Sequence, residues 1–267
     1  MAPLVGLTSS NKLRSPLLGG PLGGGPLGLL TNLVAYWDLN ESSGDRADDS
    51  GNGFTLSDNN TVGSGTGVDT GTTAADFVTA NDEYLTTADP TTASLAPRTG
   101  DYTICIWVNA DTSAEMIFGI SDSDVTTGGF LMIYTAAGSN VRVRCEDSAS
   151  VNATSLTNGG GLGDSTGVWR FVMVRVDRTA DTYSVYVDDV QQSFFTYGTT
   201  RDISALDDIT VVTSDAKRLT LGREYWGGLT ADGRMQGLGI WSENLTAAQS
   251  AWLYNSKSAA RLYSELT

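Results

Sequence analysis

Two stretches decide the fold, namely Arg170-Phe-Val-Met-Val-Arg-Val-Asp177 and Thr182-Tyr-Ser-Val-Tyr-Val187. Both are short runs rich in β-branched and aromatic residues, which favour strands. Successive side chains of a strand point to opposite faces, so Arg175 and Asp177 project to the same side. The pattern predicts two neighbouring strands in a sheet that has one wetter face.

Similar short strands, separated by turn residues, are predicted from residue 33 onward. The 31 glycines and the scarcity of lysine favour strands and turns over helices. All-β sandwiches of about 200 to 250 residues routinely form one domain, so a length of 267 residues does not force a second domain. The expected strands cover residues 33–38, 75–78, 83–86, 102–109, 115–121, 130–135, 141–147, 169–177, 182–187, 209–213, 218–222 and 233–241.

One helix is predicted near the C-terminus. Thr246 can cap it, and Gln249 stands three residues later, as in a capping box. Trp252 and Leu253 are expected to pack the helix against the sheets. Residues 258–267 either continue as a helix or form an arm.

The order of these segments resembles one known family, the laminin G-like domains of the concanavalin A-like lectin/glucanase superfamily. The resemblance spans about residues 33–255 and implies a two-sheet antiparallel jelly-roll sandwich whose first and last strands lie side by side. The motifs that carry it are Leu33-Val-Ala-Tyr-Trp37, Asp49-Ser-Gly-Asn-Gly53, Tyr102-Thr-Ile-Cys-Ile-Trp107, Trp169-Arg-Phe-Val-Met-Val174, Tyr183-Ser-Val-Tyr-Val-Asp188 and Gly233-Arg-Met-Gln-Gly-Leu-Gly-Ile-Trp241.

Two positions depart from the family pattern. Asp189 replaces the glycine of a hairpin, where an aspartate tolerates the left-handed turn acceptably. Gln236 replaces an acidic residue of the closing strand, which in calcium-binding relatives helps to hold the ion. A calcium site at Gln236 is therefore in doubt.

The residue types argue against catalysis. The chain has no histidine, which excludes Ser-His-Asp triads and His-ligated zinc. Retaining glycosidases need two carboxylates about 5 Å apart, and no suitable acidic string occurs, because Glu83, Glu115, Glu146 and Glu224 are isolated. We expect a non-catalytic protein, and we expect Cys105 and Cys145 to be buried thiols, although a disulfide between them stays possible.

No cofactor is expected, and calcium is the one candidate left open. Asp122-Ser-Asp-Val-Thr-Thr-Gly128 alternates oxygen ligands but lacks the closing glutamate of a calcium loop. Asp48, Asp49 and Asn52 form a second oxygen cluster. Both segments also fit ordinary turns, in which Asp and Asn side chains bind nearby backbone amides.

Sugar binding would use exposed aromatic rings. Arg223, Tyr225 and Trp226 are the candidate residues, because the glycines that follow them indicate a loop. The alternative is that Trp226 covers the rim of the sandwich. A second aromatic group, Phe194-Phe195 with Tyr197, fits a strand with one buried face.

Residues 1–31 differ from the rest of the chain. Proline and leucine recur as a pair every five residues, and this density of proline and glycine predicts an extended arm rather than a helix. It is either a disordered leader or an anchor whose leucines fill pockets on a partner. The pairs are Pro16-Leu17, Pro21-Leu22 and Pro26-Leu27. We expect an anchoring arm at 1–31, a sandwich at 32–257 and a tail at 258–267.

The net charge of −15 opposes nucleic acid as a partner. We find no pattern typical of a secretory signal or a membrane span, so we expect neither export nor membrane insertion. An adhesion-type fold without an export signal is typical of virion proteins, which assemble in the host cytoplasm. The resulting hypothesis is a virion accessory, a capsid-decoration, head-fibre or tail protein of a bacteriophage. In it, the arm binds other structural proteins, the domain contacts host glycans, and the chain is oligomeric within an assembly. The alternative is a carbohydrate-binding module of an extracellular or cell-surface protein.

Overall fold

A computed structural model describes residues 26–87, 95–96, 98–112, 116–121, 130–136, 140–147, 151–157, 167–195, 201–209, 218–224 and 228–267. Several predictions from the sequence lie outside these ranges. They are the arm pairs Pro16-Leu17 and Pro21-Leu22, the loop 122–128, and the aromatic residues Tyr197, Tyr225 and Trp226.

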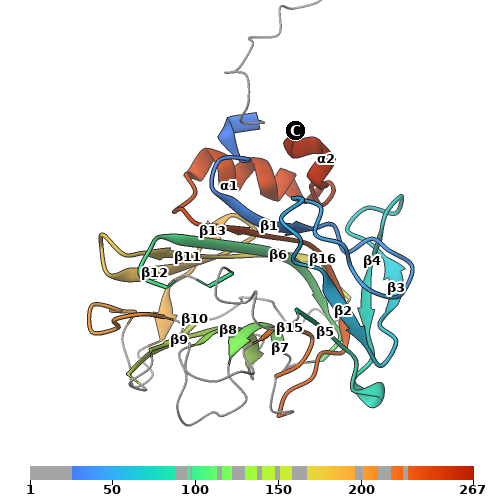
Figure 1. Cartoon of the computed structure of the whole chain (residues 1–267), viewed down its shortest axis with the longest axis horizontal. Coiled ribbons are helices and arrows are strands. Elements are labelled where there is room, and N and C mark those ends of the chain that lie inside the picture. The colour runs from blue at the N-terminus through green and yellow to red at the C-terminus, as the bar shows by residue number, and fades with distance from the viewer. Residues whose placement is uncertain are drawn as a thin grey trace, which may run out of the picture.

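The described strands form two antiparallel sheets that pack face to face (Figure 1). Sheet A runs in the order β13-β12-β11-β6-β16-β4-β3, and β1 also pairs with β16. Its strands are β1 (Leu33–Trp37), β3 (Gly63–Thr66), β4 (Thr73–Phe77), β6 (Tyr102–Ala110), β11 (Arg170–Asp177), β12 (Thr182–Val187), β13 (Val190–Gln191) and β16 (Gly233–Trp241).

Sheet B runs in the order β14-β10-β9-β8-β7-β15-β5-β2. Its strands are β2 (Leu56–Asn59), β5 (Tyr84–Thr87), β7 (Met116–Ser121), β8 (Phe130–Ala136), β9 (Asn140–Glu146), β10 (Asn152–Thr157), β14 (Phe194–Phe195) and β15 (Arg218–Leu221). The predicted antiparallel jelly-roll sandwich is thus confirmed.

The first and last strands lie side by side, as the sequence led us to expect. In the β1–β16 pair, Trp37 is opposite Leu238 and Tyr36 is opposite Gly239. β16 also pairs with β6 along both of its halves, with a register shift between Gln236 and Gly239. Gly237 lies within the shift at φ 62°, a left-handed conformation that favours glycine. On its other edge, β16 pairs with β4 through its first half and with β1 through its second half.

Most predicted strands are present within one or two residues, but several polar strands were missed. β2, β3 and β10 have the sequences LSDN, GSGT and NATSLT, which carry few apolar residues and no clear alternation. They form strands because they pair with neighbouring strands that have more apolar residues, namely β5, β4 and β9. Conversely, Ile209 was predicted to begin a strand, but it is a buried residue outside any strand.

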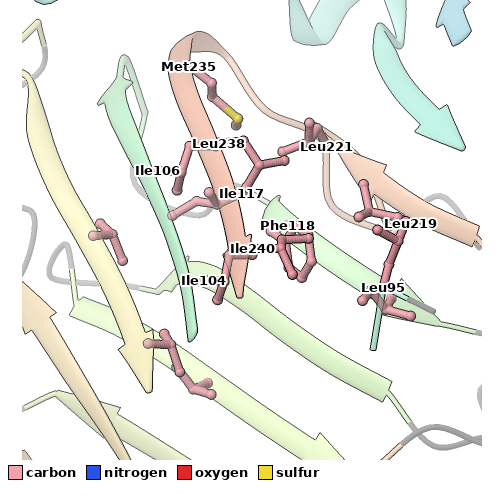
Figure 2. Packing of buried hydrophobic residues seen from close by; sticks show 14 of the residues in the cluster. Leu95, Ile104, Ile106, Ile117, Phe118, Leu219, Leu221, Met235, Leu238 and Ile240 are labelled. Carbon is pink, nitrogen blue, oxygen red and sulfur yellow. The ribbon is translucent and has the colours of Figure 1, made fainter. Parts of the chain in front are cut away.

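The main core fills the space between the two sheets. Ile104 and Ile106 of β6 face Ile117 and Phe118 of β7, and all four side chains are almost completely buried. β16 adds Met235, Leu238 and Ile240, and β15 adds Leu219 and Leu221 (Figure 2). Removal of this apolar surface from water is the main force that holds the two layers together.

A second apolar cluster lies on the outer face of sheet A, beneath α1 (Ala247–Tyr254) and α2 (Tyr263–Leu266) (Figure 1). We call it the outer cluster. Trp107, Phe171 and Trp241 stand on the sheet, and Leu253 and Leu266 reach down from the helices. The remaining members are Leu29, Tyr36, Cys105, Met173, Leu245 and Ala260. The cluster therefore joins both ends of the described chain to one face of the sandwich.

The capping box of α1 is confirmed. The Thr246 side chain accepts a hydrogen bond from the Gln249 backbone N–H, and the Gln249 side chain accepts one from the Thr246 N–H. Leu253 is buried in the outer cluster, whereas Trp252 is partly buried with the Arg261 guanidinium 4.2 Å from its ring centre. Residues beyond α1 turn through η4 (Asn255–Lys257) into α2.

The two cysteines are free and belong to different clusters. Cys105 lies in the outer cluster, and Cys145 lies in the core between the sheets. Sheet A separates their positions, so the disulfide that the sequence left possible is not formed.

Replacement of Gly239 by alanine tests the packing of the outer cluster. A Cβ at Gly239 would lie 2.4 Å from Cη2 of Trp241 and 2.9 Å from Cδ2 of Tyr36. We expect Gly239→Ala to lower the free energy of unfolding by about 1–3 kcal/mol, the usual cost of overpacking. Denaturant unfolding measures this change.

Gly63→Ala is the matched control, because a Cβ there would meet only the Asp76 carbonyl at 3.8 Å. Equal stability of the two variants would contradict the described packing.

A partly buried carboxylate holds the C-terminal tail. Asp38 Oδ1 accepts a hydrogen bond of 2.7 Å from the Tyr263 backbone N–H, and the Tyr36 hydroxyl donates to the Arg261 carbonyl at 2.5 Å. Burial raises the pKa of Asp38 from 3.8 to about 6, and the nearby Asp49 adds to the rise. The folded protein therefore binds this proton more tightly than the unfolded chain does.

Asp38 should consequently make the protein less stable as the pH rises from about 4 through about 6. Asp38→Asn keeps the acceptor for Tyr263 and removes the ionisation. We expect the variant to gain stability over the wild type at pH 7, with the gain shrinking toward pH 4. Denaturant titrations at both pH values measure it, and a constant difference across that range would show that Asp38 does not titrate in this way.

Candidate functional site

The root of the N-terminal arm is fixed to the body. Trp241 Nε1 donates to the Leu29 carbonyl at 2.7 Å, and Gln249 Nε2 donates to the Leu27 carbonyl at 3.2 Å. Leu29 is completely buried, whereas the Leu27 side chain is 53 % exposed. Pro26 and Leu27 belong to a short 3-10 helix, η1 (Pro26–Gly28). η1 thus lies on the same side of the body as α1 (Figure 1).

Sequence reasoning missed this attachment. It treated residues 1–31 as one arm, yet Leu29 and Leu30 pack against the outer cluster. The adjacent pair of leucines just before β1 was the signal that could have indicated it. Gln249 was recognised as part of a capping box but not as a donor to the arm.

Arg223 lies at one rim of the sandwich, where two loops meet. Its guanidinium forms an ion pair with Asp82 at 3.0 Å and lies 5.0 Å from the centre of the Tyr84 ring. Thr79 of the first loop donates through Oγ1 to the Ala231 carbonyl of the second at 2.8 Å. These contacts hold Arg223 against a partly buried tyrosine, beside the segment that contains the other two predicted glycan residues.

Of the two oxygen clusters considered for calcium, the structure describes only the one formed by Asp48, Asp49 and Asn52. Both carboxylate oxygens of Asp48 accept hydrogen bonds from the backbone, Oδ1 from Tyr36 and Ser50 and Oδ2 from Phe54. Asn52 donates to the Val34 carbonyl at 3.0 Å. These side chains therefore stabilise the turn. Within the described ranges no group of three or more Asp, Glu, Cys or His side chains is placed to hold a metal ion.

The glutamates singled out in the sequence have structural partners where they are described. Glu83 is buried, and its Oε2 accepts a hydrogen bond of 2.8 Å from the Val78 N–H. Glu146 forms an ion pair with Arg144, and burial raises its pKa. Glu224 is buried as well, and Glu115 lies outside the described ranges.

The two thiols are placed where a nucleophile would be ineffective. Burial raises the pKa of Cys105 and of Cys145 to about 12, so the thiolate is scarce at neutral pH. We expect neither thiol to react with a thiol-specific reagent in the folded protein at pH 8, and both to react after denaturation. Spectrophotometric titration with a disulfide reagent measures this, and rapid modification of the native protein would contradict the described burial.

The family model of the concanavalin A-like lectin/glucanases superfamily matches residues 79–249, more than half of the 267 residues. The chain belongs to this superfamily. No curated protein sequence matches it. None of the helices in the described ranges has the length and apolar character needed to cross a membrane.

Three solved structures illustrate the fold. The binding domain of Paraclostridial Mosquitocidal Protein 1 has a TM-score of 0.64 and 16% identity, over 85% of this chain and 53% of that chain. The binding domain of Botulinum Neurotoxin serotype G has a TM-score of 0.62 and 13% identity, over 84% and 50%. Domain 4 of a GH43 extracellular arabinanase from Geobacillus stearothermophilus, solved with arabinotriose, has a TM-score of 0.54 and 19% identity, over 82% and 96%.

These similarities concern the fold. The chain spans about half the length of the two toxin domains, 53% and 50%, and almost all of the arabinanase domain, 96%. The chain is a lectin-like domain, and the three similar structures are either named binding domains or were solved with a bound sugar.

Proposed function

We propose that the chain is a non-catalytic adhesion domain that its N-terminal arm attaches to a larger assembly. The assembly we favour is a virion, in which the chain serves as a capsid-decoration, head-fibre or tail protein. The observation that carries the proposal is the fixed arm root, because Trp241 and Gln249 bind the backbone of Leu29 and Leu27. Because these hydrogen bonds fix Leu27 and Leu29 to the body, a partner that held the arm would also hold the sandwich in a defined position.

The position of the arm root leaves the other surfaces available. Sheet B lies on the side of the sandwich away from α1 and η1 (Figure 1). Its strand β9 carries the partly exposed Arg142 and Arg144. An assembly that held residues 1–25 would therefore present sheet B and the Arg223 rim to a neighbouring copy, a host surface or a glycan.

Deletion of residues 1–25 tests this proposal and leaves the arm root in place. Full-length and truncated chains are each mixed with particles purified from the virus that encodes the chain and then sedimented. We expect the full-length chain to co-sediment and the truncated chain, shown to be folded by circular dichroism, to stay in the supernatant.

A second pair of variants tests whether the leucines of the Pro-Leu repeat, rather than any leucine of the arm, are needed for binding. Replacement of Leu17 and Leu22 by serine should abolish co-sedimentation, whereas the same replacement of Leu4 and Leu7, outside the repeat, should not. Unchanged binding of the truncated chain would refute an anchoring role for the arm.

A second candidate function is a carbohydrate-binding module. It is favoured by the similarity to the arabinanase domain, which this chain matches over 96% of that domain's length and which was solved with arabinotriose. A glycan array distinguishes the candidates, because specific binding supports the module and silence across the array supports the purely structural role. Loss of binding in Trp226→Ala would assign the site to the Arg223 rim.

A further inference from the structure

A row of chemically distinct side chains crosses the outer face of sheet A at its β3–β4 end. In the register of the sheet, Asn109 of β6 is opposite Arg234 of β16, and Arg234 is opposite Asp76 of β4. Trp169 directly precedes β11, whose Arg170 is opposite Val108, so Trp169 lies beside Asn109. We call these four residues the Trp169 row.

All four side chains point away from the main core. The neighbours of Asp76, Asn109 and Arg234 along their strands, such as Ala75, Val108 and Met235, belong to the core between the sheets, and successive side chains alternate. Trp169 packs against the edge of the outer cluster. In Figure 1, β3 and β4 extend to the right of the helices that cover this cluster. The row therefore begins where the helical cover ends.

Two acceptors in the row have no donor. Asn109 is 1% exposed, and its Oδ1 has no hydrogen-bond partner. Asp76 is partly buried and forms neither a hydrogen bond nor an ion pair with any described residue, although burial raises its pKa and Arg234 opposes that rise. An acceptor that has lost water without gaining a donor is unfavourable. A ligand hydroxyl group that donates to Asp76 would remove part of that penalty.

Arg234 lies across the edge of the sheet between these two acceptors. Its Nη1 donates to the Thr66 carbonyl at 3.1 Å, and its guanidinium is 5.8 Å from the centre of the Trp169 ring. The glycine at position 65 makes room, because a Cβ there would lie 2.7 Å from Arg234 Cδ and 3.1 Å from Asp76 Oδ2. Among the described residues, only the Thr66 carbonyl accepts a hydrogen bond from this guanidinium.

Trp169 differs from two of the buried tryptophans, Trp37 and Trp241. The indole N–H groups of Trp37 and Trp241 donate to backbone carbonyls at 2.8 and 2.7 Å, whereas that of Trp169 donates to no described residue. Trp169 is only partly buried. It offers an apolar ring with an unused polar edge, which suits a ligand that has both apolar and hydroxyl-bearing faces.

We propose that the Trp169 row is a binding site for a neutral saccharide. The sugar ring stacks on Trp169, and its hydroxyl groups donate to the partly buried Asp76 and accept from Arg234. Arg234 and Asp76 carry opposite formal charges, so the pair has no net charge, which suits an uncharged ligand. This inference rests on the carbohydrate-binding candidate function and assigns it a surface that is distinct from the Arg223 rim.

Affinity electrophoresis tests the proposal with the full-length chain. Gels contain arabinan, xylan, galactan, β-glucan or, as the acidic comparison, polygalacturonate. We expect at least one neutral polysaccharide to retard the wild type and polygalacturonate not to. Trp169→Ala and Asp76→Ala should each lower the affinity derived from the retardation by about tenfold. This is the order expected for loss of a stacked ring or of a hydrogen-bonded acceptor.

Trp252→Ala is the matched control, because Trp252 is also partly buried with an arginine 4.2 Å from its ring centre but has no such row beside it. It should retain the retardation. Thermal unfolding verifies each variant, and if Trp169→Ala does not fold, Asp76→Ala decides the outcome.

The outcomes separate this inference from the candidate function on which it rests. If the Trp169→Ala and Asp76→Ala variants are still retarded but Trp226→Ala is not, the Trp169 row is not the binding site. Sugar binding would then be assigned to the Arg223 rim. Absence of retardation of the wild type by every neutral polysaccharide would overturn both.

Discussion

The pairing of β1 with β16 is the constraint on which the rest of the structure depends. It brings residues near the two ends of the chain together, with Leu33 opposite Trp241 and Trp37 opposite Leu238. β16 also pairs with β6 and β4, so it is the strand through which the first strand joins the sheet. Because Trp241 Nε1 donates to the Leu29 carbonyl, the same pairing also fixes the position of the segment just before β1.

The position of β16 also separates the surfaces that could bind partners. Its second half lies under the outer cluster, the helices and the arm root. Its first half carries Arg234 on the uncovered part of the same face. The loop that precedes β16 carries Arg223 at the rim. The two thiols are buried and the Glu83 carboxylate accepts a hydrogen bond from the Val78 N–H, so these groups stabilise the fold.

β6 and β11 were predictable from the sequence because they are rich in β-branched and aromatic residues, and β16 was predictable because its motif resembles the closing strand of the family. β3 and β10 were not, since their polar and glycine-rich sequences become strands only through pairing with neighbours. The Trp169 row could not be predicted, because it depends on the register of four separate segments. Arg223 was identified from its loop sequence, but its contacts with Asp82 and Tyr84 come from tertiary structure.

Hydrogen exchange of the native protein tests the central role of the β1–β16 pair most directly. If this pair closes the sheet and holds the arm root, the paired amides of β1 and β16 and the Trp241 indole N–H should exchange as slowly as the amides of β6, through global unfolding. Exchange of β1 and of the Trp241 indole that is orders of magnitude faster than that of β6 would contradict the account. It would mean that the first strand and the arm root detach while the sandwich stays folded.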